Sequence, residues 1–347
     1  MKIIIASTII PFIDGGGLFI ADWLCAKLLE YGHQAEICRL PFCPYWRDMP
    51  EQMLALRLLH FEEYGDRLIC VRTPSYLIKH PSKFIWFIHH HRPMYDLMGS
   101  QYQDVPNTKE GLEYRQCVID ADNKSLFEAK KVYSNSKVMS ERLMKFNKIK
   151  SEVVYPPLIN EGSYYCDKYG DYIFYPSRLC QHKRQQLVIQ AMKYTKSNVK
   201  LVIAGNPDNT TIVSLLEKEI EENDLTNKVT LITRWITHEE KIKYIAESLA
   251  CAYTPLDEDS YGYVTLESFQ SHKAVITCAD SGGTIEIVTH GKNGYIVDSR
   301  PQEIAEVFDE LFINKTKAKR MGDGGFDSIK SHHVSWDNVI KKFTMKI

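Results

Sequence analysis

Two acidic residues, Asp259 and Glu267, stand eight positions apart in a stretch whose other residues fit an anion-binding loop. An apolar run ends at Thr254, and a segment with helical character follows from about Val264 to Ser271. The first backbone N–H groups of a helix have no partner within it, so a strand, a tight loop and a helix start together make a phosphate site. Asp259 lies just before this predicted helix and Glu267 in its predicted first turn. Carboxylates beside a phosphate cradle suit a ligand with hydroxyls and a diphosphate, such as a sugar nucleotide.

Two cations occupy another predicted strand-to-helix loop. Tyr172 to Tyr175 reads as a strand, and Arg178 and Lys183 follow it. Guanidinium and ammonium groups at such a loop are well placed to clamp a diphosphate. Without further context, the alternative interpretation is two solvated surface cations.

Three consecutive histidines follow the strand-like run Phe84 to Ile88. Ligands bind at the carboxyl ends of strands in open α/β sheets. Alternation sends His89 and His91 to one side and His90 to the other. We expect one histidine to contact a substrate and the others to pack or face water. Adjacent positions chelate poorly, so no metal site is predicted.

Three glycines, Gly15, Gly16 and Gly17, precede a predicted helix from Leu18 to Glu30. The pattern is not G-x-G-x-x-G, and no acidic residue stands where a ribose partner would be needed, so a dinucleotide fingerprint is not indicated. The glycines allow a phosphate to approach backbone N–H groups, and a flexible turn is the equal alternative.

Strands and helices alternate along the whole chain, which predicts an α/β protein with two doubly wound, Rossmann-like domains facing across a cleft. Residues 158–170 are loop-like and make the best linker. We therefore expect an N-terminal domain over 1–160, a C-terminal domain over 161–330, and a final helix within 331–347 that packs back on the first domain. Two further helices are expected over Glu51 to Tyr64 and over 113–131.

The composition is that of an ordinary globular protein, with 44% hydrophobic and 25% charged residues among 347. The net charge of -1 gives no global field that would select nucleic acid. Nine scattered cysteines without a C-x-x-C pair indicate reduced thiols. No signal-peptide core or 18-residue apolar span is evident, so we expect a cytoplasmic protein.

The segment from Ser136 to Lys150 is strongly basic and carries regularly spaced apolar residues. A solvated helix that covers the sheet is the favoured interpretation. The alternative is a peripheral contact with the inner membrane surface that brings the site to a lipid-linked acceptor.

Taken together, these motifs resemble those of the retaining glycosyltransferases of the GT-B fold in glycosyltransferase family 4 (group 1). The resemblance rests on the Gly15-Gly16-Gly17 loop, His89 at a strand end, Arg178-x-x-x-x-Lys183, Asp259-x7-Glu267 as the E-x7-E motif, Ser281-Gly282-Gly283-x-x-Glu286 and Gly291-x-x-Gly294. The stretches WFIHHHRPMYDL, YSNSKVMSERL and YPP resemble a subgroup typical of bacterial surface-polysaccharide and lipopolysaccharide synthesis.

The resemblance implies a UDP- or GDP-sugar donor bound in the second domain and a glycan or lipid-linked acceptor. It implies that Glu267 holds the ribose hydroxyls and that Asp259 faces the donor sugar. It also places Arg178, Lys183, Tyr263, Val264, Gly16 and Gly17 at the diphosphate, His89 at the sugar hydroxyls, Arg234 and Trp235 at the nucleobase, and Gly205 and Gly262 in the donor site.

The implied reaction is hexosyl transfer with retention, in which the leaving phosphate oxygen takes the acceptor proton and no metal or cofactor is required. Asp259 departs from the glutamate usual in the family, and the adjacent Glu258 could replace it only in a shifted loop. Three alternatives remain open from the sequence: a sugar-nucleotide epimerase, a weakly active nucleotide-sugar-binding protein, and a nicotinamide-dependent oxidoreductase, which lacks its glycine fingerprint.

Overall fold

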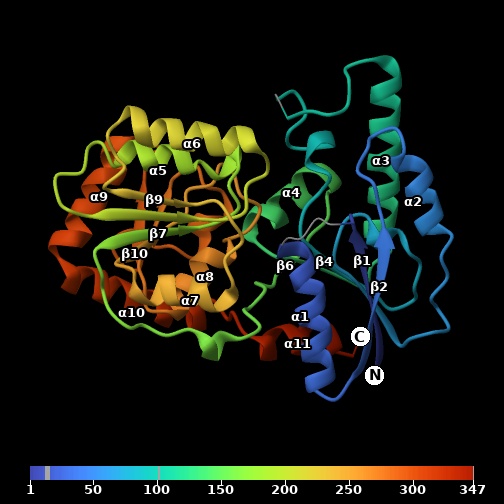
Figure 1. Ribbon diagram of the computed structural model, residues 1–347. Coiled ribbons are helices and arrows are strands. Elements are labelled where there is room, and N and C mark those ends of the chain that lie inside the picture. The colour runs from blue at the N-terminus through green and yellow to red at the C-terminus, as the bar shows by residue number, and fades with distance from the viewer. Residues whose placement is uncertain (12–15, 101, 347) are drawn as a thin grey trace. The chain divides into compact units, whose positions relative to one another are not determined.

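The computed structural model describes residues 1–11, 16–100 and 102–346, and the chain forms two compact units. Unit 1 comprises Met1–Pro156 and Ser335–Ile347, and unit 2 comprises Pro157–Val334. Each unit is built around one six-stranded parallel sheet (Figure 1). The predicted α/β class with two doubly wound sheets is therefore confirmed.

The sheet of unit 1 has the strand order β2-β1-β3-β4-β5-β6. The chain runs outward from β1 to β2 and then crosses back to β3, so the strand order reverses between β1 and β3. Its strands are β1 Lys2–Ile9, β2 Gln34–Pro41, β3 Arg67–Cys70, β4 Lys83–Phe87, β5 Lys131–Ser134 and β6 Glu152–Val153, and its helices are α1 Gly16–Glu30, α2 Met49–Arg57, α3 Lys109–Phe127, α4 Lys137–Asn147 and α11 Trp336–Thr344.

The sheet of unit 2 has the order β12-β11-β10-β7-β8-β9, and its strand order reverses between β7 and β10. Helix α5 packs against α6 and α9, and α8 packs against α7 and α10, which gives the two helical layers visible around this sheet (Figure 1). Its strands are β7 Tyr172–Pro176, β8 Lys200–Ala204, β9 Val229–Ile232, β10 Ala250–Ala252, β11 Val275–Cys278 and β12 Gly294–Val297, and its helices are α5 Gln185–Ala191, α6 Thr210–Glu222, α7 His238–Glu247, α8 Tyr263–Gln270, α9 Pro301–Ile313 and α10 Lys315–Ser331.

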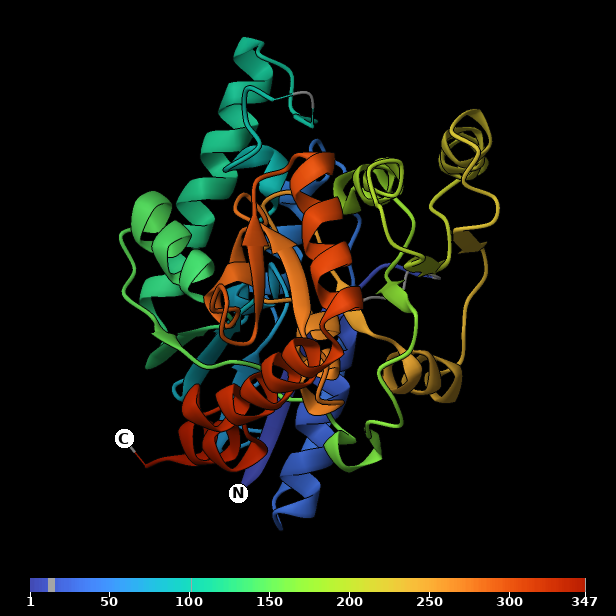
Figure 2. The same cartoon turned by 90° about the vertical axis from the view of Figure 1, so that its left-hand side faces the viewer.

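Helix α11 returns the chain to unit 1, where it lies beside α1 (Figure 2). The ring of Phe343 packs 5.1 Å from that of Trp86 and 4.9 Å from that of Tyr133. The guanidinium of Arg67 donates to the carbonyls of Phe343, at 2.6 Å, and Met345, at 2.9 Å. A cation at these carbonyls satisfies acceptors that a helix end leaves open.

Two helix boundaries differ from the sequence prediction. The helix predicted over Glu51 to Tyr64 ends at Arg57, because His60 then forms a parallel β-bridge with Lys79 and needs extended backbone. The helix predicted over 113–131 begins earlier, at Lys109, because the Thr108 side chain accepts the N–H of Gly111 and caps it.

The basic segment at 136–150 forms α4, whose apolar residues Met139 and Leu143 are fully buried in the core of unit 1. The favoured interpretation, a helix covering the sheet, accounts for its apolar spacing. Another apolar residue of α4, Met144, is 38% exposed. Within the described part of the chain, we find no helix both long and apolar enough to cross a bilayer.

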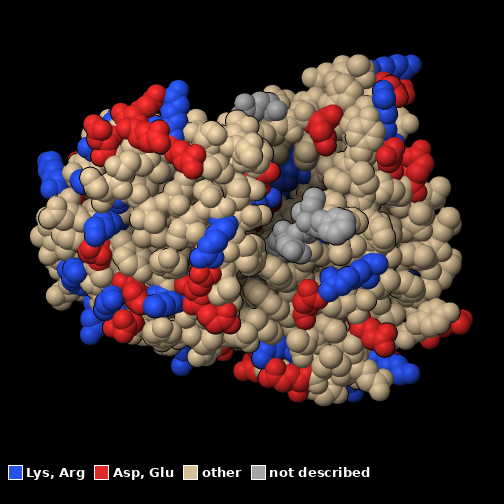
Figure 3. All heavy atoms as spheres, in the orientation of Figure 1, with Lys and Arg blue, Asp and Glu red and all other residues tan. Residues whose placement is uncertain are grey.

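Charged side chains of both signs are interspersed on the face of the molecule in Figure 3. The exception is a group of acidic residues over α6, whose last turns carry Glu217, Glu219, Glu221 and Glu222. This face therefore offers no basic stripe of the kind that nucleic acid selects.

Candidate donor site

The strand-order reversal in unit 2 brings two loops together at the carboxyl ends of β7 and β10. Ligands of open α/β sheets bind at this position, since the connections diverge there and leave a crevice. The loop after β7 carries Arg178 and Lys183, and the loop after β10 carries Glu258 and Asp259. The topology thus places the predicted cations and carboxylates at the same edge of the sheet.

Lys183 is the most closely held of these residues, with 12% of its side chain exposed. Its ammonium forms an ion pair with the Glu258 carboxylate, donates to the Tyr253 hydroxyl at 2.7 Å, and lies 5.0 Å from the centre of that ring. The Tyr175 hydroxyl donates to the Lys183 carbonyl, which fixes the backbone. Lys183 is therefore a positioned cation and not a solvated surface lysine.

The ion pair with Lys183 keeps the Glu258 carboxylate ionised at neutral pH. Burial alone would raise the pKa of Glu258, but the charge and hydrogen bond of Lys183 outweigh it and hold that pKa below its ordinary value. Burial and the neighbouring Lys183 charge lower the pKa of His182 to about 4. His182 is therefore neutral at physiological pH.

Arg178 is much more exposed to solvent than Lys183. Its side chain is 53% exposed, and its Nε lies 3.3 Å from the Asp208 carboxylate. The sequence did not single out Arg184, which forms a two-pronged salt bridge to Asp280 at 2.7 Å and donates to the Thr254 carbonyl at 2.8 Å. Arg184 ties the loops after β7, β10 and β11 together, whereas Arg178 can move toward a ligand.

Glycines allow the backbone to close around the Glu258 loop. Gly262 has φ 71° and caps the start of α8, where a Cβ would lie 2.2 Å from a Tyr253 ring carbon. Gly282 has φ 61°, and a Cβ there would lie 2.4 Å from the Glu258 carbonyl oxygen. Only glycine fits both positions without strain.

The start of α8 places Tyr263 and Val264 directly after Gly262. Glu267 is the fifth residue of this helix and lies in its second turn, which corrects the prediction that it occupies the first. The helix dipole therefore offers little explanation for an acid here, because its effect fades beyond the first turn.

Glu267 is instead held in a buried ion pair. Its side chain is 5% exposed and accepts from the Lys241 ammonium at 2.5 Å and from the Tyr164 hydroxyl at 3.1 Å. Neither partner was predicted from the sequence. Lys241 could have been considered from the sequence, because it lies on α7, the helix just before β10. Tyr164 lies in the linker, where no sequence pattern marks it.

Three predicted residues lie at the ends of β8 and β9. A Cβ on Gly205 would lie 1.9 Å from the Ser177 carbonyl oxygen, so glycine permits the loops after β7 and β8 to touch. Arg234 pairs with Glu240 through contacts of 2.6 and 3.0 Å. Trp235 is 67% exposed, which is unusual for so large an apolar side chain.

Unit 1 contains the other predicted residues. Gly15 lies outside the described residues, and Gly16 and Gly17 are the first residues of α1, which corrects the prediction of a helix starting at Leu18. The sequence missed Arg72, whose side chain passes 3.4 Å from the Cβ position of Gly17 and donates to the Thr8 carbonyl at 3.0 Å. Arg72 follows the carboxyl end of β3, where ligands bind in open α/β sheets, so the sequence could have indicated it.

The three histidines have distinct environments. The Nδ1 of His89 lies 2.7 Å from the His90 carbonyl oxygen, and His89 is half-buried. His90 is fully buried against Asn147, and burial lowers its pKa to about 4. His91 lies 3.0 Å from the Asp104 carboxylate. Among the described residues, no three His, Cys, Asp or Glu side chains gather as a metal site would require.

Most of unit 2 is similar to one family of known proteins. Residues 167–327, just under half of the chain, match the model of the glycosyl transferases group 1 family. An alpha-1,3/1,6-mannosyltransferase (ALG2) of Dictyostelium discoideum is 29% identical over 158 residues, covering 42% of this chain and 37% of that protein. A GDP-mannose-dependent alpha-(1-6)-phosphatidylinositol monomannoside mannosyltransferase of Mycobacterium tuberculosis is 26% identical over 176 residues, covering 48% of this chain and 44% of that protein. The alignments thus span less than half the length of these curated relatives.

Solved structures match the whole chain at low identity. HepE (Alr3699) of Anabaena, in complex with UDP and glucose, has a TM-score of 0.73 at 15% identity and covers 99% of this chain and 100% of its own. Sucrose-phosphate synthase of Thermosynechococcus elongatus has a TM-score of 0.77 at 15% identity, covering 98% and 96%.

The fold class is therefore that of the GT-B glycosyltransferases. Residues 167–327 match the glycosyl transferases group 1 model, which confirms the resemblance to that family seen in the sequence.

Proposed function

We propose that this chain transfers a sugar from a nucleotide diphosphate donor to a hydroxyl of a glycan or lipid-linked acceptor, with retention at the anomeric carbon. The observation that carries the proposal is the Lys183 ammonium, held by Tyr253 and Glu258 at the strand-order reversal of unit 2 beside the glycine-capped start of α8. This is where a diphosphate finds a fixed cation and the N-terminal end of a helix.

The chemistry that such a site supplies is stabilisation of charge on the departing diphosphate. Lys183 provides a positioned charge, and Arg178 provides a second one that can leave Asp208 when a donor arrives. A retaining glycosidase uses two carboxyl groups about 5–5.5 Å apart, one of them as nucleophile. Here we infer instead that the acceptor attacks on the face the diphosphate leaves, and that a phosphate oxygen takes the acceptor proton. Neither a metal nor a cofactor is part of this route.

Other residues are proposed to contact the ribose, the sugar and the base of the donor. We infer that Glu267 binds the ribose hydroxyls, Asp259 faces the donor sugar, and Arg234 and Trp235 contact the base. From unit 1, Gly16 and Gly17 would approach the diphosphate and His89 the sugar hydroxyls. The curated relatives include a GDP-mannose-dependent enzyme, and HepE structures contain UDP and UDP-glucose. We therefore propose a UDP- or GDP-sugar donor and a role in cell-surface polysaccharide synthesis.

The decisive experiment replaces the two cations. We expect Lys183→Ala to lower kcat/KM by roughly 100-fold or more and Arg178→Ala by about ten-fold, because each removes charge from the leaving group. Lys200→Ala is the matched control, since Lys200 begins β8 at the opposite end of the sheet and is 54% exposed. Transfer of a radiolabelled sugar measures the rate. Near-wild-type turnover in both cation variants would refute the assignment.

Two further arms of this assay separate neighbouring functions. Incubation of the donor without acceptor should leave the sugar unchanged, whereas an epimer in the product would identify an epimerase. Transfer should persist in EDTA, and activity lost in EDTA and restored by Mg²⁺ would contradict the metal-independent route.

A further inference from the structure

An open cavity of about 750 Å³ lies in unit 2, between the linker segment and α10. Its size falls within the range of about 300–1,000 Å³ usual for small-molecule sites. It opens at the C-terminal end of α8, where Gln270 and His272 line it, whereas the proposed diphosphate site lies at the opposite end of that helix. The mechanism above makes no use of it.

Aromatic rings form its apolar surfaces. Tyr165 is 50% exposed and Phe326 is 39% exposed, although both line the cavity. The Phe326 ring stacks on the His272 imidazole, with centroids 4.3 Å apart and planes 15° from parallel. The stacked Phe326 and His272 rings, called the platform below, leave part of the Phe326 ring exposed to pack against the C–H face of a sugar ring.

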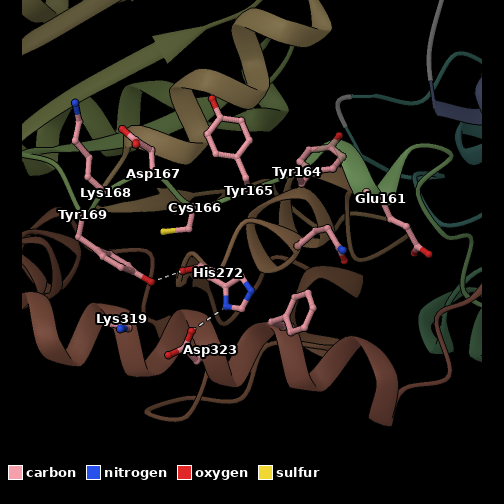
Figure 4. A pocket seen from close by; sticks show the side chains of 13 residues that line it. Glu161, Tyr164, Tyr165, Cys166, Asp167, Lys168, Tyr169, His272, Lys319 and Asp323 are labelled. Carbon is pink, nitrogen blue, oxygen red and sulfur yellow. Dashed lines mark hydrogen bonds and ion pairs between the residues drawn. The ribbon is translucent and has the colours of Figure 1, made fainter.

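The platform is held in place before any ligand arrives. Nδ1 of His272 lies 2.8 Å from the Asp323 carboxylate, and the Tyr169 hydroxyl donates to the His272 carbonyl at 2.7 Å. Figure 4 shows His272 and Asp323 pointing toward each other between the 164–169 segment and α10. A wall fixed in this way costs less ordering free energy when it binds.

The polar lining carries both signs of charge. Glu161, Asp167 and Asp323 contribute carboxylates, and Lys168 and Lys319 contribute ammonium groups. Such a set donates and accepts hydrogen bonds but has no excess of cations, so it suits a neutral polyhydroxylated ligand better than a phosphate or an acidic sugar.

We propose that this cavity is an accessory binding site for a neutral oligosaccharide, such as a stretch of the acceptor or product glycan. The identity of that glycan as acceptor or product rests on the proposed function. Tyr164 lines the cavity and donates to Glu267, so the site shares one wall residue with the proposed donor pocket.

The test uses an array of short oligosaccharides, neutral and uronic-acid-containing, probed with the full chain. Neutral glycans should be retained, and titration with the best-retained one should give a Kd that rises roughly ten-fold in Tyr165→Ala and in Phe326→Ala. Lys319→Ala, at an exposed position, should weaken binding without a risk to folding. The matched control is Tyr194→Ala, whose ring is 44% exposed elsewhere in unit 2 and should leave the Kd unchanged.

Lys183→Ala separates the two proposals, since it should abolish transfer and keep glycan binding. If the wild-type chain transfers no sugar but Tyr165-dependent glycan binding remains, the cavity site stands and the proposed enzyme does not. The cavity proposal is overturned if no neutral glycan is retained, if acidic glycans are preferred, or if the cavity variants bind like Tyr194→Ala.

Discussion

Lys183 forms an ion pair with Glu258, and this pair affects the affinity of the site for an anion. The ion pair neutralises the ammonium, and the carboxylate repels an arriving diphosphate. We expect Glu258→Gln to tighten UDP or GDP binding by a few-fold, because the repulsion is lost while the Tyr253 contact to Lys183 remains. Calorimetric titration at two salt concentrations measures the change. A weaker Kd would show instead that Glu258 acts by positioning Lys183.

A buried carboxyl group in unit 1 links stability to pH. Burial raises the pKa of Asp122 to about 7, while the hydroxyls of Tyr76 and Tyr95 donate to it at 2.8 and 2.6 Å. The unfolded chain loses this proton near its ordinary pKa of 3.8, so the folded state is penalised as pH rises from about 4 to 7. His90 opposes this trend. Burial lowers its pKa from 6.5 to about 4, and stability is therefore lost as pH falls through the same window.

Asp122→Asn should remove the Asp122 contribution to the pH dependence of stability and leave that of His90. Relative to wild type, the free energy of unfolding of the variant should rise by about 4 kcal/mol between pH 4 and pH 7, since one pKa unit corresponds to about 1.36 kcal/mol. Urea unfolding across that range measures the difference. A difference independent of pH would mean that Asp122 is ionised in the folded protein.

Sequence reasoning at this scale found residues that follow strands but not their partners. Arg178 and Lys183 were identifiable because cations after a strand are an ordinary ligand-binding pattern, and the structure brings Lys183 to the acidic loop. The sequence does not show that Glu258, and not Asp259, binds Lys183, because a loop has no periodic pattern that tells neighbouring residues apart. Tyr164 and Lys241 reach Glu267 from distant segments, and only the tertiary fold reveals that.

At the scale of elements, α8 owes its start to Gly262 and not to a side-chain cap. The helix has no capping hydrogen bond from its N-cap side chain, and glycine there lets the chain turn tightly over Tyr253. The sequence placed this helix to within a residue. Starting the helix at Tyr263 instead of Val264 moves Glu267 from the fourth residue to the fifth, because helix starts without a Ser, Thr, Asp or Asn cap have no distinct signal.

Helix α11 stabilises unit 1 through Phe343, which is fully buried between Trp86 and Tyr133. Phe343→Ala should lower the free energy of unfolding of unit 1 by about 3–5 kcal/mol, the usual cost of emptying such a site. Phe127→Ala is the control, because that ring is 67% exposed in the same unit. Denaturant unfolding followed by tryptophan fluorescence measures both, since all tryptophans except Trp235 lie in unit 1, and equal losses would contradict the packing role.

At the scale of the whole molecule, each unit has its own hydrophobic core. A nucleotide that is bound mainly by unit 2 should therefore stabilise that part of the unfolding profile most. We expect UDP or GDP to raise the melting temperature of the unit 2 transition by mass action, and Lys183→Ala to abolish that shift. Differential scanning calorimetry resolves the transitions. A shift that survives in Lys183→Ala would place the nucleotide elsewhere.

The fold was predictable because the alternation of strand-like and helical segments is repeated along the chain. Buried parallel strands such as β7 and β8 read as short apolar runs, and each is followed by a helix, α5 and α6 respectively. The strand order was not predictable, since no local pattern says which strands are neighbours. That order brings the loops after β7 and β10 together.

The return of α11 also sets an order of events during synthesis. The ribosome completes every strand of the first sheet by Val153, yet Phe343 emerges only after all of unit 2 has been made. Domains fold as units while the chain is still growing, so unit 2 can bury its core first. Trp86 and Tyr133 meanwhile remain without the ring that covers them. The unit whose synthesis starts first is thus the last to complete its core.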